Sequence, residues 1–227
     1  MNRTLLLSLF AAFLSLPLTA QFGVTTTYNI NNINGEALVD GLPYDVFPID
    51  NGYEIQAHYW FRLPNKRIEF QPTVFYAGAS IDAFNAGPAV TFQDFGFQFE
   101  VNVYPFDFGG DCGCPTFGKQ GPKLEKGFFV QLFPGIARRS VRSNGGIAAD
   151  LAETAFVYGG GIGLDIGVSN LLTLTPIATV RRGRSPYASL KSTDGTGNPV
   201  TLGNDNDQLM SYQLGIQATF RFDKKRY

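Results

Sequence analysis

The sequence has few charged residues and few of the residues that build metal or catalytic centres. Of its 227 residues, 16% are charged, one is histidine and two are cysteines. A typical soluble domain is about 25% charged. The formal net charge is −1, whereas a nucleic-acid-binding domain is usually strongly basic. The composition therefore argues against a nucleic-acid partner, and no cofactor is indicated.

Long hydrophobic runs are absent after the first twenty residues. Residues 1–20 contain one basic residue, Arg3, then an apolar run from Leu5 to Leu16 and the small residue Ala20. This order is typical of a secretory signal peptide, and the run is shorter than the ~20 residues of a membrane-spanning helix. We expect cleavage after Ala20, which removes only Arg3 and changes the net charge from −1 to −2. A retained N-terminal helix is the alternative.

Short segments of alternating apolar and polar residues fill the rest of the sequence. In the last of them, apolar residues from Tyr212 to Phe222 alternate with a polar set from Ser211 to Arg221. A period of two indicates a β-strand with two different faces. Eight segments follow this pattern: residues 22–30, 53–63, 68–78, 94–103, 128–139, 156–168, 172–182 and 208–222.

The two faces of these segments differ in a way that favours a membrane barrel. One face gathers acids and amides, and the other is rich in aromatic residues at its ends. A membrane β-barrel has an apolar outer face with aromatic girdles and a polar interior. We therefore predict an all-β fold, an eight-stranded antiparallel up-and-down transmembrane β-barrel over residues 21–222. Residues 223–227 would form a short charged periplasmic tail. A soluble barrel of the lipocalin kind, with the faces reversed, is the alternative.

The chain resembles the small outer-membrane barrels of the OmpA/OmpX type. The resemblance rests on the signal peptide, the eight amphipathic segments and the aromatic C-terminal strand with residues 218–222. The charged residues after that strand are similar to the outer membrane protein β-barrel domain proteins of Bacteroidota. The resemblance implies a place in the cell outer membrane, among lipid and lipopolysaccharide, and the barrel-assembly machinery as partner during insertion. The segment Cys112-Gly113-Cys114-Pro115 departs from the simplest members.

The predicted connections alternate in length. Residues 31–52, 79–93, 140–155 and 183–207 would face outward, and residues 64–67, 104–127 and 169–171 would face the periplasm. Long outer loops and short periplasmic turns are expected. Segment 104–127 is too long for a turn, so it is either an ordered extension or a sign of a missed hairpin. Pro72 and Pro134 remove ladder donors and are expected to mark bulges.

The interior of an eight-stranded barrel is about wide enough for its own side chains. Opposite charges there predict a salt-bridged plug rather than a solute pore. The inward glycines Gly159, Gly161 and Gly163 would make room for Trp60 or Phe75. The predicted polar network of the lumen consists of Glu54, His58, Arg62, Glu69, Asp94, Glu100, Asp165, Arg181 and Arg221.

The sequence offers little for catalysis. Some small outer-membrane barrels transfer or remove acyl chains with a histidine–serine pair, which needs the two side chains within hydrogen-bond reach. His58 is the one histidine, and no serine lies two residues from it. We therefore predict no catalytic residue and no metal site, and expect His58 to be bonded to a carboxylate. Cys112 and Cys114 could form a local disulfide after export; a metal or redox role is the alternative.

Two groups of arginines end the fifth and seventh segments. In the predicted topology they lie at the outer rim, where guanidinium groups could pair with lipopolysaccharide phosphates. The predicted contacts are Arg138, Arg139, Arg142, Arg182 and Arg184. Pairing with Asp150 and Glu153 in the intervening loop is the alternative.

The sequence as a whole favours a non-enzymatic outer-membrane barrel with polar, surface-exposed loops. Envelope structure, adhesion or docking are the functions that this architecture indicates. A lipid-modifying envelope enzyme and a narrow channel or transporter for small ligands are the alternatives.

Overall fold

The computed structural model describes residues 21–34, 36–39, 42–45, 49–62, 67–81, 90–107, 127–143, 151–169, 171–185, 191–193, 199–201 and 208–220. The predicted signal peptide and the tail lie outside these residues, as do Cys112 and Cys114. No helix in the described part of the chain is long and apolar enough to cross a membrane.

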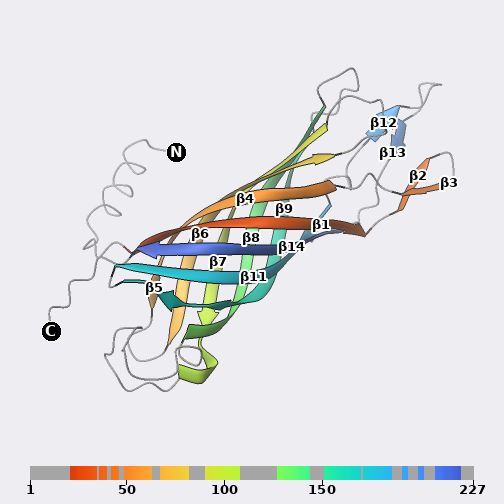
Figure 1. Ribbon diagram of the computed structural model, residues 1–227. Helices are drawn as coiled ribbons and strands as arrows, with labels where there is room; N and C mark the ends of the chain where they lie inside the picture. Colours follow the sequence, from red (N-terminus) through yellow and green to blue (C-terminus); the bar gives the residue numbers. More distant parts are fainter. Residues whose placement is uncertain are drawn as a thin grey trace, which may run out of the picture.

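Eight long strands form one closed antiparallel sheet (Figure 1). Each pairs with its neighbours in the sequence, and the first pairs with the last, Phe22 opposite Phe220. This confirms the predicted eight-stranded up-and-down barrel. The strands are β1 (Phe22–Asn34), β4 (Ile49–Tyr59), β6 (Ile68–Ile81), β7 (Val90–Val103), β8 (Phe128–Ser143), β9 (Leu151–Leu164), β11 (Leu172–Arg184) and β14 (Gln208–Phe220).

The register of the strands determines how strongly they tilt. The cross-strand partners of Thr219 run through Gly23, His58, Thr73, Gln98, Gly135, Val157 and Gly183 and return to β14 at Leu209. One circuit therefore shifts the register by 219 − 209 = 10 residues. For eight strands, such a shear corresponds to strands inclined at about 40° to the barrel axis, within the usual range.

The barrel has a polar interior and an apolar exterior. Along β4, for example, Glu54, Gln56 and His58 are buried inside, whereas Tyr53 and Ile55 are exposed. The other strands alternate in the same way. This burial confirms the predicted assignment of faces and is the reverse of the lipocalin-like alternative.

Five successive outward positions on each strand carry no charged residue. We call these positions the apolar belt. They alternate along residues 22–30, 53–61, 68–76, 95–103, 128–136, 156–164, 172–180 and 212–220. Aromatic side chains pair near both edges of the belt, as in Tyr28–Tyr53 at one edge and Phe22–Phe220 at the other.

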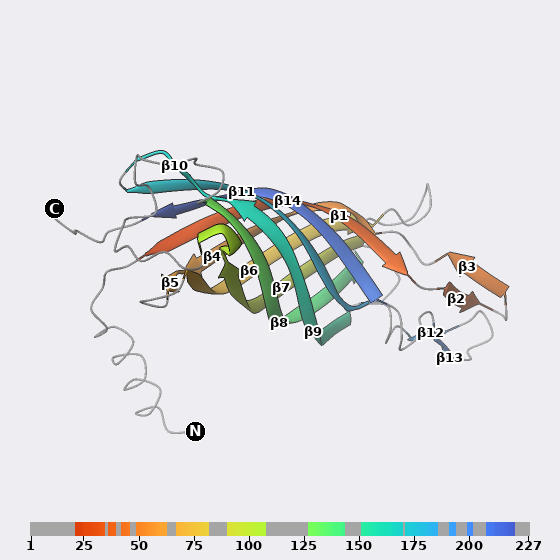
Figure 2. The same cartoon turned by 90° about the horizontal axis from the view of Figure 1, so that it is seen from below.

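Two additional hairpins lie within the long connections at one end of the barrel (Figures 1 and 2). They consist of β2 (Glu36–Val39) with β3 (Leu42–Asp45), and of β12 (Lys191–Thr193) with β13 (Pro199–Thr201). Sequence patterning had indicated only loops there. The short β5 (Phe61–Arg62), β10 (Ile166–Gly167) and the 3-10 helix η1 (Pro105–Asp107) lie at the opposite end.

The long connection after β7 does not hide a further barrel strand. β7 pairs directly with β8 along most of its length, from Val90 opposite Ser143 to Val103 opposite Val130. The missed-hairpin alternative is therefore wrong for the barrel wall. The described part of the connection is Tyr104, η1 and Gly127, and residues 108–126 lie outside the described chain.

The bulges expected at two prolines are absent. Pro72 and Pro134 sit on the outward face, and the register is the same on both sides of each. The β7–β8 ladder is interrupted opposite Pro134, between the pairs Gln98–Gly135 and Val101–Leu132. A proline costs a ladder bond here without inserting a residue, so the register of the strand is unchanged.

Candidate functional site: the barrel interior and its outer rim

Large aromatic side chains fill the interior by lying against glycines on the next strand. Phe133 is directly opposite Gly159, and Phe129 is opposite Gly163. A Cβ at Gly159 would lie 2.6 Å from Cζ of Phe133, and a Cβ at Gly163 would collide with the Phe129 ring. The glycines therefore admit these two phenylalanines, not Trp60 or Phe75 as the sequence suggested. Phe75 packs instead against Gly96, whose Cβ would lie 2.6 Å from Cζ of Phe75.

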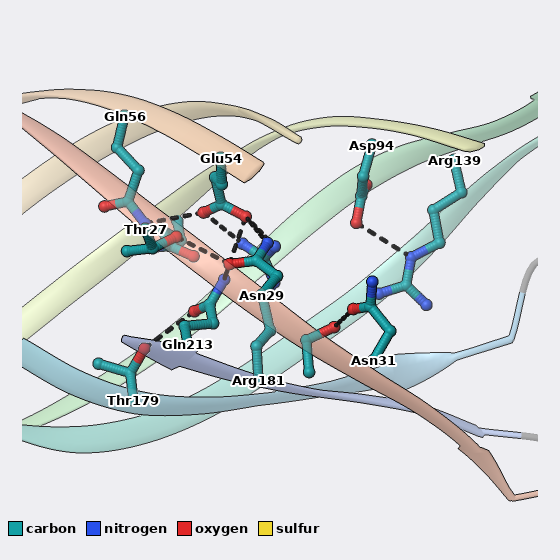
Figure 3. Close-up of polar contacts among 12 residues, drawn as sticks. Thr27, Asn29, Asn31, Glu54, Gln56, Asp94, Arg139, Thr179, Arg181 and Gln213 are labelled. Carbon is teal, nitrogen blue, oxygen red and sulfur yellow. Dashed lines mark hydrogen bonds and ion pairs between the residues drawn. The ribbon is translucent and has the colours of Figure 1, made fainter. Parts of the chain in front are cut away.

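Glu54 is the centre of the largest polar network (Figure 3). Both of its carboxylate oxygens accept from Arg181, with Nη1 at 3.0 Å from Oε1 and Nη2 bonded to Oε2. Three amides also donate to this carboxylate: Gln56 at 2.7 Å, Gln213 at 3.1 Å and Asn29 at 3.2 Å. A buried charge is tolerated when it is paired and hydrogen-bonded in this way.

Arg181 crosses the barrel to reach Glu54. It projects from β11, whereas Glu54 projects from β4, which lies across the interior. Its guanidinium carbon also lies 4.2 Å from the centre of the Phe75 ring. The ion pair thus joins two walls that are three strands apart and, together with Phe75, occupies the interior between them.

A second ion pair lies nearer the end that carries the hairpins. Arg139 Nε is 3.4 Å from Asp94 Oδ2, and both side chains are 2% exposed (Figure 3). Arg139 Nη1 also donates to the backbone oxygen of Arg184. The expectation that Arg139 contacts lipid phosphate is therefore wrong: it points inward and belongs to the plug.

Glu100 is held by amides. Gln98 Nε2 lies 2.7 Å from Oε1, and Gln131 Nε2 lies 2.8 Å from Oε2. All three side chains are buried on the inward faces of β7 and β8. This layer contributes hydrogen bonds to the plug rather than a third ion pair.

The opposite end is closed around Tyr104. Its hydroxyl lies 2.8 Å from Glu69 Oε2 and 2.7 Å from Asp165 Oδ2, and its ring packs against Phe129. Trp60 Nε1 also donates to Glu69, and Thr175 donates to Asp165. Arg67 lies over the Tyr104 ring, 4.0 Å from its centre. Tyr104 follows β7 directly, so this cluster ties the start of the long connection to the barrel end.

The structure brings most of the predicted lumen residues inside, in separate clusters. Glu54 and Arg181 form one, Asp94 lies in the second, and Glu69 with Asp165 lies at the Tyr104 end. The side chains of Arg62 and Arg221 lie outside the described part of the chain. Sequence reasoning overlooked Tyr104, although its position, the next inward one after Asn102, continues the period of two.

His58 is not bonded to a carboxylate as expected. It is buried against Gly23, and its Nε2 lies 3.5 Å from the hydroxyl oxygen of Thr219. No serine hydroxyl contacts it among the described residues. Within the same residues, no three His, Cys, Asp or Glu side chains are placed to hold a metal ion.

The remaining rim arginines differ in their surroundings. Arg138 and Arg184 are exposed, and Arg182 is half-buried. Arg184 Nη1 pairs with Glu153 Oε1 at 2.8 Å, which is the local pairing considered as the alternative. Arg182 Nε donates to Gln208 Oε1. The side chain of Arg142 and the whole of Asp150 lie outside the described chain.

No family model and no curated protein sequence matches the chain. Solved structures resemble it in fold. Neisserial surface protein A is 12% identical, with 88% of this chain and 97% of that chain covered and a TM-score of 0.46. Ail, the attachment invasion locus protein of Yersinia pestis, is 12% identical, with 88% and 99% covered and a TM-score of 0.45. A major outer membrane protein from Thermus thermophilus is 11% identical, with 88% and 99% covered and a TM-score of 0.42.

Proposed function

We propose that this chain is a non-enzymatic integral outer-membrane β-barrel that carries its long connections at the cell surface, for envelope structure, adhesion or docking. The observation that carries the proposal is that polar side chains line the inside of the barrel and apolar ones the outside, the reverse of a soluble barrel. At the height of the belt, charged and amide side chains point inside, and the exposed outer positions are uncharged on all eight strands. An uncharged band that continues around the whole barrel is typical of a surface covered by lipid rather than water.

The height of the apolar belt also supports a location in the outer membrane. Five alternate positions span eight residue steps of about 3.3 Å, and a tilt of about 40° reduces that length to roughly 20 Å along the barrel axis. This is close to the ~25 Å apolar band of outer-membrane barrels. Lipid would surround the belt, and the barrel-assembly machinery would insert it.

The filled interior favours a structural role over conduction. The half of the interior nearer the hairpins holds Phe75, the Glu54–Arg181 pair and the Asp94–Arg139 pair. Tyr104 with its partners closes the opposite end. A solute would have to break buried ion pairs, which is costly because each leaves an unpaired charge. His58, the one histidine, lies among these packed side chains rather than at the lipid face, which supports a non-enzymatic role.

Heat-modifiability combined with fractionation tests this function. We expect the protein in the outer-membrane fraction, with an unboiled form that runs faster on a gel than the boiled form. A soluble periplasmic protein without a mobility shift would refute the membrane assignment. Deleting the loop hairpins, residues 36–45 and 191–201, should then abolish adhesion or docking while leaving the gel shift intact.

A further inference from the structure

The polar edge of the apolar belt at the hairpin end has an uneven charge. The first outward positions beyond the belt hold neutral residues on six strands and arginine on two. The neutral ones are Asn32, Asn51, Gly78, Gln93, Thr154 and Met210. Arg138 on β8 and Arg182 on β11 are the two exceptions. No acidic residue occupies any of these eight positions, so positive charge is concentrated in one sector of the wall.

Both arginines flank β9. Arg138 is opposite Thr154, and Arg182 is opposite Tyr158. Neighbouring strands are about 4.8 Å apart, so β8 and β11 are roughly 10 Å apart across β9, and the two positions are also offset by four residues, about 13 Å, along β9. The two Cα atoms are therefore about 16 Å apart, a distance that two long arginine side chains can bridge only through phosphate groups that lie between them. The exposed rings of Phe156 and Tyr158 lie on β9 between them, stacked with centroids 6.0 Å apart. The sector thus has exposed aromatic side chains on the strand that lies between the two arginines.

Both guanidinium groups have N–H donors that no acceptor among the described residues uses. Arg182 uses Nε for Gln208, which leaves both of its Nη groups without an acceptor among the described residues. Arg138 likewise has no acceptor there and is exposed. Arg184, in contrast, is engaged by Glu153. Guanidinium groups bind phosphate through paired hydrogen bonds, and aromatic rings suit the zone just inside a membrane surface.

We propose that the β8–β9–β11 sector binds a phosphorylated lipid of the outer leaflet, with its phosphate groups bound by Arg138 and Arg182 and its acyl chains against Phe156 and Tyr158. The inference rests on the proposed membrane location. It narrows the five arginines of the sequence pattern to two, because Arg139 is inside the barrel, Arg184 is paired, and the Arg142 side chain lies outside the described chain. A lipid is favoured over a free anion because the arginines continue directly from the apolar belt.

The test is lipopolysaccharide binding by the refolded mature protein in nonionic detergent micelles. Wild type, R138Q/R182Q and the control R184Q are first checked for the gel shift on heating, which separates a failure of the barrel from a failure of the site. We expect R138Q/R182Q to weaken binding by about tenfold or more, because charge-assisted hydrogen bonds are lost. R184Q should change binding by less than about twofold, since it is a surface ion-pair partner.

Two further arms identify the ligand. Dephosphorylated lipopolysaccharide should bind wild type as weakly as R138Q/R182Q binds the intact lipid, and inorganic phosphate should not displace the intact lipid. If R138Q/R182Q does not refold, R138K/R182K replaces it; this variant keeps the charge but loses the paired geometry and should bind several-fold more weakly. Equal binding by wild type and the folded double variant would overturn the proposal. Full displacement by inorganic phosphate would overturn the assignment to a lipid.

Discussion

Individual glycines decide how the interior of this barrel is filled. Gly159, Gly163 and Gly96 each face a phenylalanine ring from the adjacent strand, and none of these sites has space for a Cβ. Alternation in the sequence showed that these glycines point inward. It could not show which side chain covers them, because strand register and rotamers decide that. The predicted partners Trp60 and Phe75 were therefore wrong, although the predicted role was right.

Replacing Gly163 with alanine should destabilise the barrel by roughly 1–3 kcal/mol, the usual effect of overpacking a filled core. The added Cβ would collide with the Phe129 ring, which is itself packed against Tyr104. Gly78→Ala is the matched control, because a Cβ at Gly78 meets nothing within 4 Å. Urea unfolding of both variants in lipid vesicles measures the difference. A Gly163→Ala midpoint equal to that of Gly78→Ala would show that Phe129 can move aside at little cost.

At the scale of the strand, the sequence pattern located all eight barrel strands and the direction of their side chains. It made several strands too short: β7 begins at Val90 rather than Asp94, and β8 continues to Ser143 rather than Arg139. These extensions carry polar outward residues, such as Gln93 and Ser140, so apolar alternation stops before the ladder does. The β2–β3 and β12–β13 hairpins escaped detection because strands of three or four residues show too little periodicity.

The sequence pattern also could not predict which charged residues pair across the barrel. The clearest case is Glu54 on β4 with Arg181 on β11, which are 127 residues apart in sequence. The interior list included both residues, but a list of inward residues does not give their height in the barrel. The height depends on shear, which in turn depends on the register of all eight strands.

Breaking the pair between β4 and β11 should destabilise the barrel far more than breaking a surface pair. Glu54→Gln leaves Arg181 charged and buried, with an expected cost of about 3–5 kcal/mol. Glu153→Gln is the control: it removes the partner of the exposed Arg184, at an expected cost of about 0–1 kcal/mol. Unfolding in lipid vesicles gives both values.

The double variant Glu54→Gln/Arg181→Met should recover much of the stability, since it leaves no unpaired charge inside. If Glu54→Gln costs no more than Glu153→Gln, water must reach Arg181, and the plug would be open enough for a narrow channel. The same measurement therefore separates the structural role from the channel alternative.

At the scale of the whole molecule, the barrel has a polar interior and an apolar exterior. The fluorescence of its single tryptophan can therefore test which of the two contacts lipid. Trp60 is 6% exposed and donates to Glu69 inside the barrel, whereas Phe97 is 49% exposed at the second of the five belt positions of β7. In vesicles with brominated acyl chains, Trp60 fluorescence should be quenched weakly. The variant W60F/F97W, whose tryptophan faces lipid, should be quenched strongly.

Both proteins carry one tryptophan, so the ratio of their quenching is independent of how much protein inserts, provided that each shows the gel shift on heating. If Trp60 in the wild type were quenched as strongly as the tryptophan of W60F/F97W, the interior would be in contact with lipid, which would contradict the closed polar plug. Weak quenching of both would mean that water or protein, rather than lipid, covers the apolar belt. Only the combination of a protected Trp60 and an accessible tryptophan at position 97 fits a barrel that keeps its charges inside and its aromatic surface in the bilayer.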